Sequence, residues 1–249
     1  MGFEKTFEHM MELWITPEIE KRQKENLIEK PYKLDAAQVI FFPDSRKPLI
    51  LLNREIKAIT KVKLKKGITK EKGDPIYENE IDGIHSIKIP AEVDPDSGHI
   101  TAIRIQDKWI LSFDFIYNKE FSQKHIINGN QFLELAKIAL SSKYWGAFID
   151  NLFSAAELYV KALLLFHPDP KLRNKDTHKL IHNRYNKFAN LGNVPIEQKN
   201  VFNKLTSARR DARYLKSEFH ITEEEANYYL NIVDDMKIEA EKHLINKES

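Results

Sequence analysis

Hydrophobic side chains recur at spacings of three and four between residues 3 and 15, where phenylalanine, methionine and tryptophan form one stripe. That spacing predicts a helix with one apolar face. The sequence Thr16-Pro17-Glu18 follows directly and is typical of a helix start, because it supplies a capping hydroxyl, a proline in the first turn and an acid. A second short helix is therefore expected, ending near Leu27.

From Ala36 onward the pattern changes to short runs of β-branched and aromatic residues separated by turn-forming residues. Such runs predict strands, and the turn chemistry between them favours antiparallel pairing. Six strands are expected, at residues 38–42, 49–52, 58–64, 84–89, 100–106 and 109–116. With the preceding helices they predict an α+β domain over residues 1–127, built on a small, mainly antiparallel sheet.

The strand pattern stops between Asn118 and Asn130, and everything that follows has helical periodicity. Five helices are expected, at residues 131–141, 144–166, 177–191, 195–216 and 222–244. The second ends at a His-Pro-Asp-Pro sequence, since proline cannot continue a helix. The fifth begins with a capping box formed by Thr222 and Glu225. The short connections predict a compact five-helix bundle over residues 128–249.

Composition narrows the function classes. The chain has 249 residues, of which 42% are hydrophobic and 31% charged, as in an ordinary soluble globular protein. Neither glycine-rich phosphate loop, GxGxxG or GxxxxGK[ST], occurs, and the absence of cysteine excludes disulfides, thiolate zinc sites and cysteine nucleophiles. No apolar run is long enough for a membrane span and the N-terminus is not typical of a secretory signal, so we expect a cytoplasmic protein without membrane contact.

The segment Ser207–His220 (SARRDARYLKSEFH) concentrates candidate chemistry, because it holds three arginines, a tyrosine and a histidine. Arg209 and Arg213 are four residues apart, which places them on the same face of a helix, one turn apart. Two guanidinium groups so placed repel each other unless an anion lies between them. That anion is either a carboxylate of the same fold or a phosphate of a ligand.

Four segments carry a resemblance to a known family. Ser154–Phe166 (SAAELYVKALLLF) resembles the long second helix of the HEPN family, and Thr177–Leu180 resembles the entry to its third helix. Ala208–Tyr214 and the helix after it resemble the Arg-Tyr segment and final helix of the same family. The resemblance covers roughly residues 128–246 and implies a small all-helical domain.

Many members of the HEPN family are metal-independent ribonucleases in which an Arg and a His, a few residues apart, meet their copies across a homodimer. The resemblance therefore implies Arg213 and His220 as catalytic residues, assisted by Arg209, without a metal or cofactor. Further candidates for substrate contact are Arg210, Tyr214 and Glu157. The implied setting is toxin–antitoxin or antiphage defence, and RNA is the expected partner.

Two features leave a second interpretation open. Tyr214 follows the Arg where active members usually carry Asn, His or Asp. Arg213 could also pair with Glu157 or Asp150 inside the bundle, with His220 merely preceding the last helix. The alternative function is thus a non-catalytic module for dimerisation or for binding a nucleotide or protein. Arg173 and His178 also have ribonuclease spacing, but they lie before the third helix, away from the family's motif.

Outside this segment, lysines cluster in the N-terminal half, with Lys61, Lys63 and Lys65 alternating along one expected strand. Alternation places their side chains on one face, where they would either follow a phosphate backbone or protect an exposed strand edge. The N-terminal domain is expected to bind a partner or ligand. His178 and His182 have metal-ligand spacing on a helix, but no third ligand is nearby, which favours surface histidines.

Overall fold

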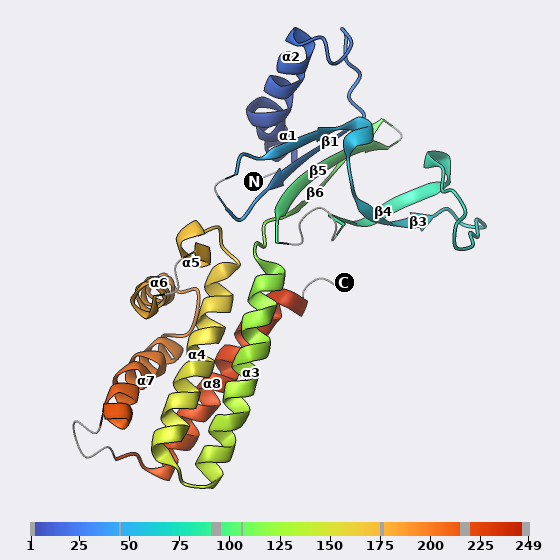
Figure 1. The fold of residues 1–249 in the computed structure, drawn as a ribbon. Helices are drawn as coiled ribbons and strands as arrows, with labels where there is room; N and C mark the ends of the chain where they lie inside the picture. The colour runs from blue at the N-terminus through green and yellow to red at the C-terminus, as the bar shows by residue number, and fades with distance from the viewer. Residues whose placement is uncertain are drawn as a thin grey trace. The chain divides into compact units, whose positions relative to one another are not determined.

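The computed structural model of the chain describes residues 3–44, 46–90, 96–105, 107–174, 177–214 and 220–245, without the side chains at 3, 174, 213, 214 and 245. The chain divides into two compact units, one ending at Phe115 and the other beginning at Ile116 (Figure 1). The N-terminal unit combines helices with antiparallel sheet and the C-terminal unit is helical, as the sequence predicts.

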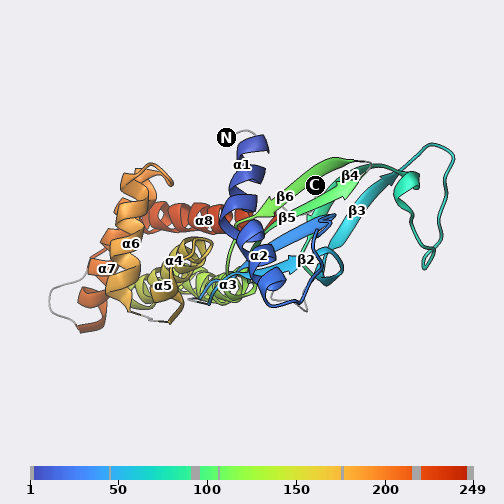
Figure 2. The ribbon, with the colours of Figure 1, turned by 90° about the horizontal axis from the view of Figure 1, so that it is seen from above.

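The N-terminal unit opens with a helical segment made of α1 (Phe3–Met10), the π-helical turn η1 (Met11–Ile15) and α2 (Thr16–Lys24). This segment covers one face of a four-stranded antiparallel sheet of order β2-β1-β5-β6 (Figure 2). The strands are β1 (Ala36–Phe41), β2 (Leu49–Leu52), β5 (Gly98–Ile105) and β6 (Lys108–Asp114). Met10 and Ile15 of the helical segment pack on Val39, Ile100 and Ala102 of the sheet.

The opposite face of the same sheet carries buried polar side chains. Thr101 on β5 lies opposite Gln38 on β1, and the Gln38 amide donates to the Thr101 hydroxyl over 2.9 Å. The same hydroxyl lies 2.9 Å from Nδ1 of His99. Strand residues of alternating parity point to opposite faces, so Gln38, His99 and Thr101 lie on the face turned away from the helical segment.

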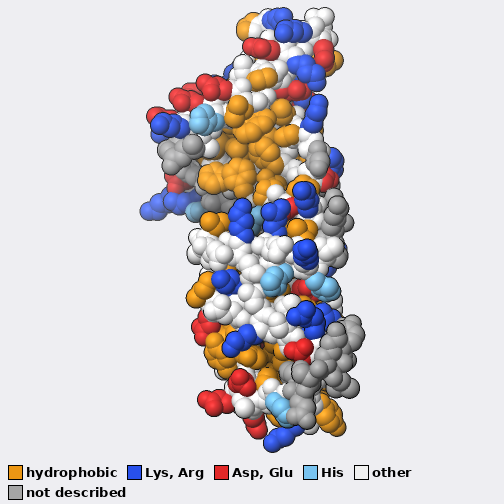
Figure 3. Space-filling view, turned by 90° about the vertical axis from the view of Figure 1, so that its left-hand side faces the viewer, with side chains coloured by type: hydrophobic (Ala, Val, Ile, Leu, Met, Phe, Trp, Pro, Cys, Tyr) orange, Lys and Arg blue, Asp and Glu red, His pale blue; other side chains and the backbone are white. Residues whose placement is uncertain are grey.

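Apolar side chains also gather on the surface of the N-terminal unit (Figure 3). Phe113 and Phe115 stack with ring centroids 5.8 Å apart, and the centroids of the Phe115 and Phe41 rings are 5.9 Å apart. The Phe41 ring in turn meets Trp14 edge-on at 5.2 Å. Phe113 is 59% exposed, so the helical segment leaves part of this aromatic face uncovered.

A second, two-stranded antiparallel sheet pairs β3 (Ile59–Leu64) with β4 (Ile81–Lys88). Two single turns of 3₁₀-helix flank its strands, η2 (Asn53–Glu55) before β3 and η3 (Glu78–Glu80) before β4. All six expected strands are present, but they form two sheets rather than one. The register shifts between Lys61 and Val62 and again between Lys63 and Leu64, which twists this hairpin.

The C-terminal unit consists of α3 (Lys119–Ser141), α4 (Trp145–Leu165), α5 (Pro170–Asn174), α6 (His178–Asn190), α7 (Ile196–Tyr214) and α8 (Glu223–Ile245). α4 lies at its centre and contacts α3, α6, α7 and α8 (Figure 1). It is buried over most of its circumference, which explains its nearly continuous apolar sequence. The expected capping box is confirmed, because Glu225 N–H donates to Thr222 Oγ1 and Thr222 N–H donates to Glu225 Oε2.

The first helix of this unit is longer than the sequence predicts. It was expected over residues 131–141 but begins at Lys119, so the expected boundary between 127 and 128 falls inside α3. Asn128-Gly129-Asn130 favours a turn in isolation. Gly129 packs so closely on α4 that a Cβ there would lie 2.7 Å from Cε1 of Tyr159. Tyr159 also donates to Asn130 over 2.7 Å, so tertiary packing keeps this segment helical.

Candidate functional site

Two carboxylates on α4 face the helices that carry the candidate residues. Asp150 Oδ1 accepts a hydrogen bond from Nε of Arg209 on α7 at 2.8 Å. Two turns further along α4, Glu157 pairs with Nδ1 of His178 at the start of α6. The Arg209 and Asp150 side chains are 19% and 30% exposed, so water screens this ion pair only in part. Asp150 and Glu157 of α4 thus face α7 and α6, respectively.

Aromatic rings lie between these two polar pairs. Phe153 is 2% exposed, and the Arg209 guanidinium lies 4.5 Å from the centroid of its ring. The same ring is stacked on Phe202 of α7, with an interplanar angle of 8°, and lies 6.2 Å from the His178 ring. A cation over an aromatic face is attracted by the ring quadrupole. The Phe153 ring therefore attracts the Arg209 guanidinium and, together with Asp150, fixes its position.

The predicted site residues differ in their exposure and in their hydrogen-bond partners. Arg209 is held by Asp150, whereas its neighbour Arg210 is exposed. Glu157 pairs with His178, and its expected contact with substrate stays a prediction. His220 is exposed and lies three residues before α8 begins.

Arg213 and Tyr214 occupy the last turn of α7, but their side chains lie outside the described residues. The expected pairing of Arg213 with Asp150 or Glu157 therefore stays a prediction. Asp150 makes its described hydrogen bond to Arg209, one turn earlier on α7. The α7–α8 junction is the place where an Arg213–His220 site would have to form.

Sequence analysis missed His178 and Phe153 as members of this cluster. His178 drew attention for its spacing to His182 and to Arg173, but not as a partner of Glu157. The two histidine rings have different partners, because Nδ1 of His182 lies 3.2 Å from the Asn186 amide. In the described part of the chain, no group of three His, Asp or Glu side chains is placed to hold a metal ion. Arg173 contacts Asn118 and the Phe121 ring, away from the His178–Glu157 pair.

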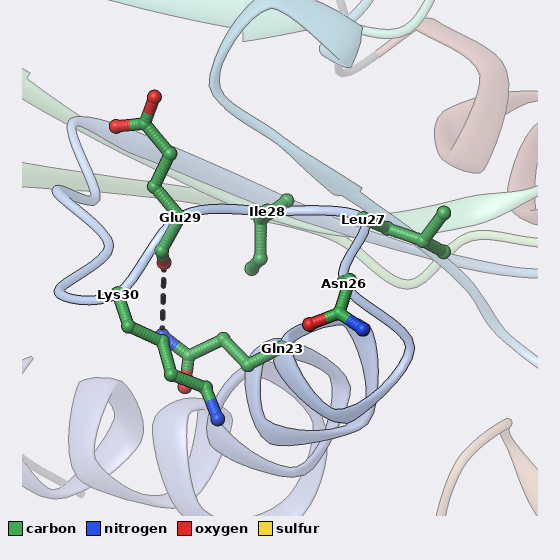
Figure 4. A pocket seen from close by; sticks show the side chains of 6 residues that line it. All are labelled: Gln23, Asn26, Leu27, Ile28, Glu29 and Lys30. Carbon is green, nitrogen blue, oxygen red and sulfur yellow. Dashed lines mark hydrogen bonds between the residues drawn. The ribbon is translucent and has the colours of Figure 1, made fainter.

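Open hollows lie elsewhere in the chain. One of about 450 Å³ follows α2 and is lined by Gln23, Asn26, Leu27, Ile28, Glu29 and Lys30. The Gln23 amide closes this loop by donating to the Glu29 carbonyl at 3.1 Å, while the Glu29 carboxylate and the Leu27 side chain point outward (Figure 4). The Gln23 side chain thus orders the loop, and the charged groups of the loop do not converge on the hollow.

Comparison with family models assigns the helical unit. Residues 122–241 match the family model described as HEPN domain. The C-terminal half of the chain is a HEPN domain. The match spans α4, α6 and α7 with their Asp150–Arg209 and Glu157–His178 pairs, and it includes the Arg213–His220 segment of the HEPN unit. No curated protein matches the chain. Among the described residues, no helix is both long and apolar enough to cross a membrane.

The geometry predicts that Arg209 stabilises the HEPN unit. Arg209→Ala removes a partly buried hydrogen bond to a carboxylate and a cation–π contact, and we expect a loss of about 1–3 kcal/mol in the free energy of unfolding. Urea unfolding of Arg209→Ala, Asp150→Ala and the double variant measures the coupling, expected at about 1 kcal/mol.

The exposed neighbour Arg210 provides the matched control, because Arg210→Ala should change the same free energy by less than about 0.5 kcal/mol. Equal effects of the two arginine substitutions, or a coupling of zero between Arg209 and Asp150, would contradict the structural role given to Arg209.

Proposed function

We propose that the HEPN unit is a metal-independent endoribonuclease, with Arg213 and His220 as its catalytic pair and Arg209 as a positioning residue. The observation that carries this proposal is the anchoring of α7. Arg209 fastens α7 to α4 through Asp150 and Phe153, one turn before Arg213. A fixed helix end of this kind presents an arginine to a flexible polyanion in one orientation.

The proposed chemistry needs only proton transfer and charge stabilisation. One histidine accepts the proton of the ribose 2′-hydroxyl, and the 2′-oxygen attacks the neighbouring phosphorus. The bond to the 5′-oxygen breaks, and that oxygen takes a proton from a second histidine. An arginine binds the non-bridging phosphate oxygens through two parallel hydrogen bonds as charge develops. The products are a 2′,3′-cyclic phosphate and a free 5′-hydroxyl.

Two histidines require two copies of the motif, so the proposal includes a homodimer. HEPN units often dimerise, and α3 presents an apolar stripe, because Ile127, Leu135 and Ile138 share one helix face and are at least half exposed. Light scattering of the 29.2 kDa chain should therefore return about twice that mass at micromolar concentration.

The variant Leu135→Glu/Ile138→Glu should return this mass to that of a single chain, whereas Lys187→Glu, at an exposed position of α6 outside the apolar stripe, should leave the dimer intact. A wild-type chain that stays monomeric would remove the basis for a shared site.

A cleavage assay tests the proposed activity directly. Single-stranded RNA should be cut by the full chain in the presence of EDTA, and the 3′ ends should carry a 2′,3′-cyclic phosphate. Loss of cleavage on addition of EDTA, with recovery on adding a divalent cation, would contradict a mechanism based on Arg and His alone. If the activity holds, its proposed setting is toxin–antitoxin or antiphage defence.

One observation favours a second candidate function. Arg209 is already neutralised by Asp150, and Tyr214 follows Arg213, so the arginines of α7 could serve mainly to organise the bundle and its dimer. In that case the HEPN unit is a non-catalytic module that binds a nucleotide or protein. Absence of cleavage with every RNA tested, together with an intact dimer, would favour this function.

A further inference from the structure

The β3–β4 hairpin of the N-terminal unit presents an array of lysines to solvent. Along β3, exposed and half-buried residues alternate, so Lys61 and Lys63 lie on the exposed face while Val62 points to the opposite face. Lys65 and Lys66 continue the array beyond the end of the strand and are also exposed. A strand rises about 3.3 Å per residue, so alternate lysines are about 7 Å apart. Neighbouring phosphates along a nucleic-acid strand have separations of the same order.

Only part of this positive charge is neutralised by the hairpin itself. Lys63 lies 2.6 Å from Asp82 of β4, and the hydrogen bond from Lys63 holds the pKa of that carboxyl below its usual value. Over the described residues, Lys61, Lys65 and Lys66 have no carboxylate within ion-pair distance. Three cations of the hairpin are therefore available to an external anion.

The connection between the two strands adds an exposed aromatic ring. Lys70 donates to the Pro75 carbonyl at 2.9 Å and pairs with Glu80 at 2.7 Å, which orders this connection. The Lys65 N–H donates to the Glu80 carbonyl, and Glu80 N–H donates to the Tyr77 carbonyl. Tyr77 is thus the N-cap residue of η3, whose last residue Glu80 bonds to Lys65, and its side chain is 60% exposed. The Lys70 ammonium lies 5.4 Å from the centroid of the Tyr77 ring.

We propose that the β3–β4 hairpin binds single-stranded RNA, with Lys61, Lys65 and Lys66 contacting phosphates and Tyr77 stacking on a base. Lysines beside an exposed aromatic ring are the combination that holds single strands, because charge follows the backbone and the ring accepts any base. The inference rests on the proposed action on RNA, to which it adds a recruiting surface distinct from the cleavage site.

Protection of an exposed strand edge explains fewer features of the hairpin than RNA binding does. A single lysine on an exposed edge strand is enough to discourage pairing with another chain. Lys65 and Lys66 lie past the end of β3, where they have no strand edge to protect. Nor does edge protection account for a tyrosine that the hydrogen bonds of this connection order and yet leave exposed. RNA binding accounts for both features.

The test uses a probe that the proposed mechanism cannot cleave, a fluorescent 2′-O-methyl RNA of about twelve nucleotides, and the full-length chain. Binding is followed by fluorescence anisotropy over a range of KCl concentrations. For single strands the slope of log K against log salt changes by about 0.7 per phosphate contact. Lys61→Gln/Lys65→Gln/Lys66→Gln should therefore reduce the magnitude of the slope by about 2. Tyr77→Ala should weaken binding about 5- to 100-fold and leave the slope unchanged.

Matched controls separate the hairpin from overall charge. Lys5→Gln/Lys24→Gln/Lys47→Gln removes three exposed lysines from the same unit but outside the hairpin, and should change the slope by less than 0.5. Tyr144→Ala removes a tyrosine that is 68% exposed in the HEPN unit, and should leave affinity unchanged. Equal effects of the two triple variants, or no binding of the probe by the wild-type chain, would overturn the proposal.

The lysines could instead bind the anionic lipids of a membrane surface. If the hairpin triple variant loses binding to phosphatidylserine vesicles while its RNA binding is unchanged, the surface belongs to a membrane and the proposal is wrong. Because the probe lacks a free 2′-hydroxyl, these outcomes do not depend on catalysis. Failure of the Arg213–His220 mechanism would be visible only with unmodified RNA, so the two proposals fail separately.

Discussion

His220→Ala should lower the rate of RNA cleavage by about 10²–10⁴-fold, the usual contribution of a positioned general acid or base. His220 is exposed, so its removal leaves no cavity and should not change the free energy of unfolding by more than about 0.5 kcal/mol. Single-turnover cleavage of a labelled RNA measures the rate, and urea unfolding measures the stability. The combination of a stable fold and a lost rate is what a catalytic role predicts.

Arg213→Ala should lower the same rate at least as much, because the arginine stabilises charge that develops on the phosphate. Arg213→Lys keeps the charge but loses the two parallel hydrogen bonds, so we expect it to recover only part of the rate. The matched control for His220→Ala is His9→Ala, which removes an exposed histidine distant from His220 in the sequence. The His9→Ala chain should cleave RNA at the wild-type rate.

The shared site adds a sharper test. Dimers of one wild-type and one His220→Ala chain retain a single His220, whereas the proposed mechanism uses one His220 as base and the other as acid. Such mixed dimers should therefore cleave RNA about as slowly as the His220→Ala homodimer, and cleavage at half the wild-type rate would mean that each chain carries a complete site. If His220→Ala cleaves RNA at the wild-type rate, the proposed mechanism fails; if Arg213→Ala is inactive only because it unfolds, Arg213 is a structural residue.

Local sequence signals predicted those parts of the fold that depend on neighbouring residues. The Thr222–Glu225 capping box lies three residues apart, so its reciprocal hydrogen bonds need no tertiary information. α4 is apolar nearly all round, which indicated burial on several sides, and it is the central helix of its unit. The start of α3 was missed, because a polar stretch ending in Asn-Gly-Asn is helical only through its contact with Tyr159.

The candidate site was predicted less completely, for the same reason. Arg209 and Glu157 were recognised as unusual from their own helices, yet their partners come from distant segments. Asp150 is 59 residues from Arg209, and His178 is 21 residues from Glu157. Helical spacing indicates which face a side chain occupies but not which helix that face meets. The pairing of α4 with α6 and α7 supplies this information, and it places a carboxylate, rather than a phosphate, beside Arg209.

The position of the domain boundary leads to a prediction with a large effect on stability. A fragment of residues 116–249 should fold alone into a nearly all-helical unit, whereas a fragment of residues 128–249 should be largely unfolded. The shorter fragment lacks the first nine residues of α3 and the segment before it, which contain Ile126 and Tyr117, 4% and 7% exposed. Each such side chain contributes about 1.5–3 kcal/mol through burial.

Residues 116–127, which the shorter fragment lacks, also provide hydrogen-bond donors for the last carbonyls of α4. The last carbonyls of a helix have no partner within it. Here the Asn118 amide donates to the Leu165 carbonyl at 2.8 Å, and the Tyr117 N–H donates to the Phe166 carbonyl at 3.2 Å. The buried Ser122 hydroxyl donates to Ala162 at 3.1 Å. Leaving such carbonyls unpaired in the interior costs about 1–3 kcal/mol each, so the combined loss approaches the whole stability of a domain, about 5–15 kcal/mol.

Circular dichroism at 222 nm and urea unfolding distinguish the two fragments. Residues 116–249 should show a cooperative transition, and residues 128–249 should show little helix and no transition. Asn118→Ala/Ser122→Ala in the longer fragment should lie between them, because it keeps the apolar contacts and removes the side-chain hydrogen bonds to α4 and to Arg173. Equal stability of the two fragments would mean that α3 contributes nothing before residue 128, since the contacts of Ile126 and Asn118 would then be dispensable.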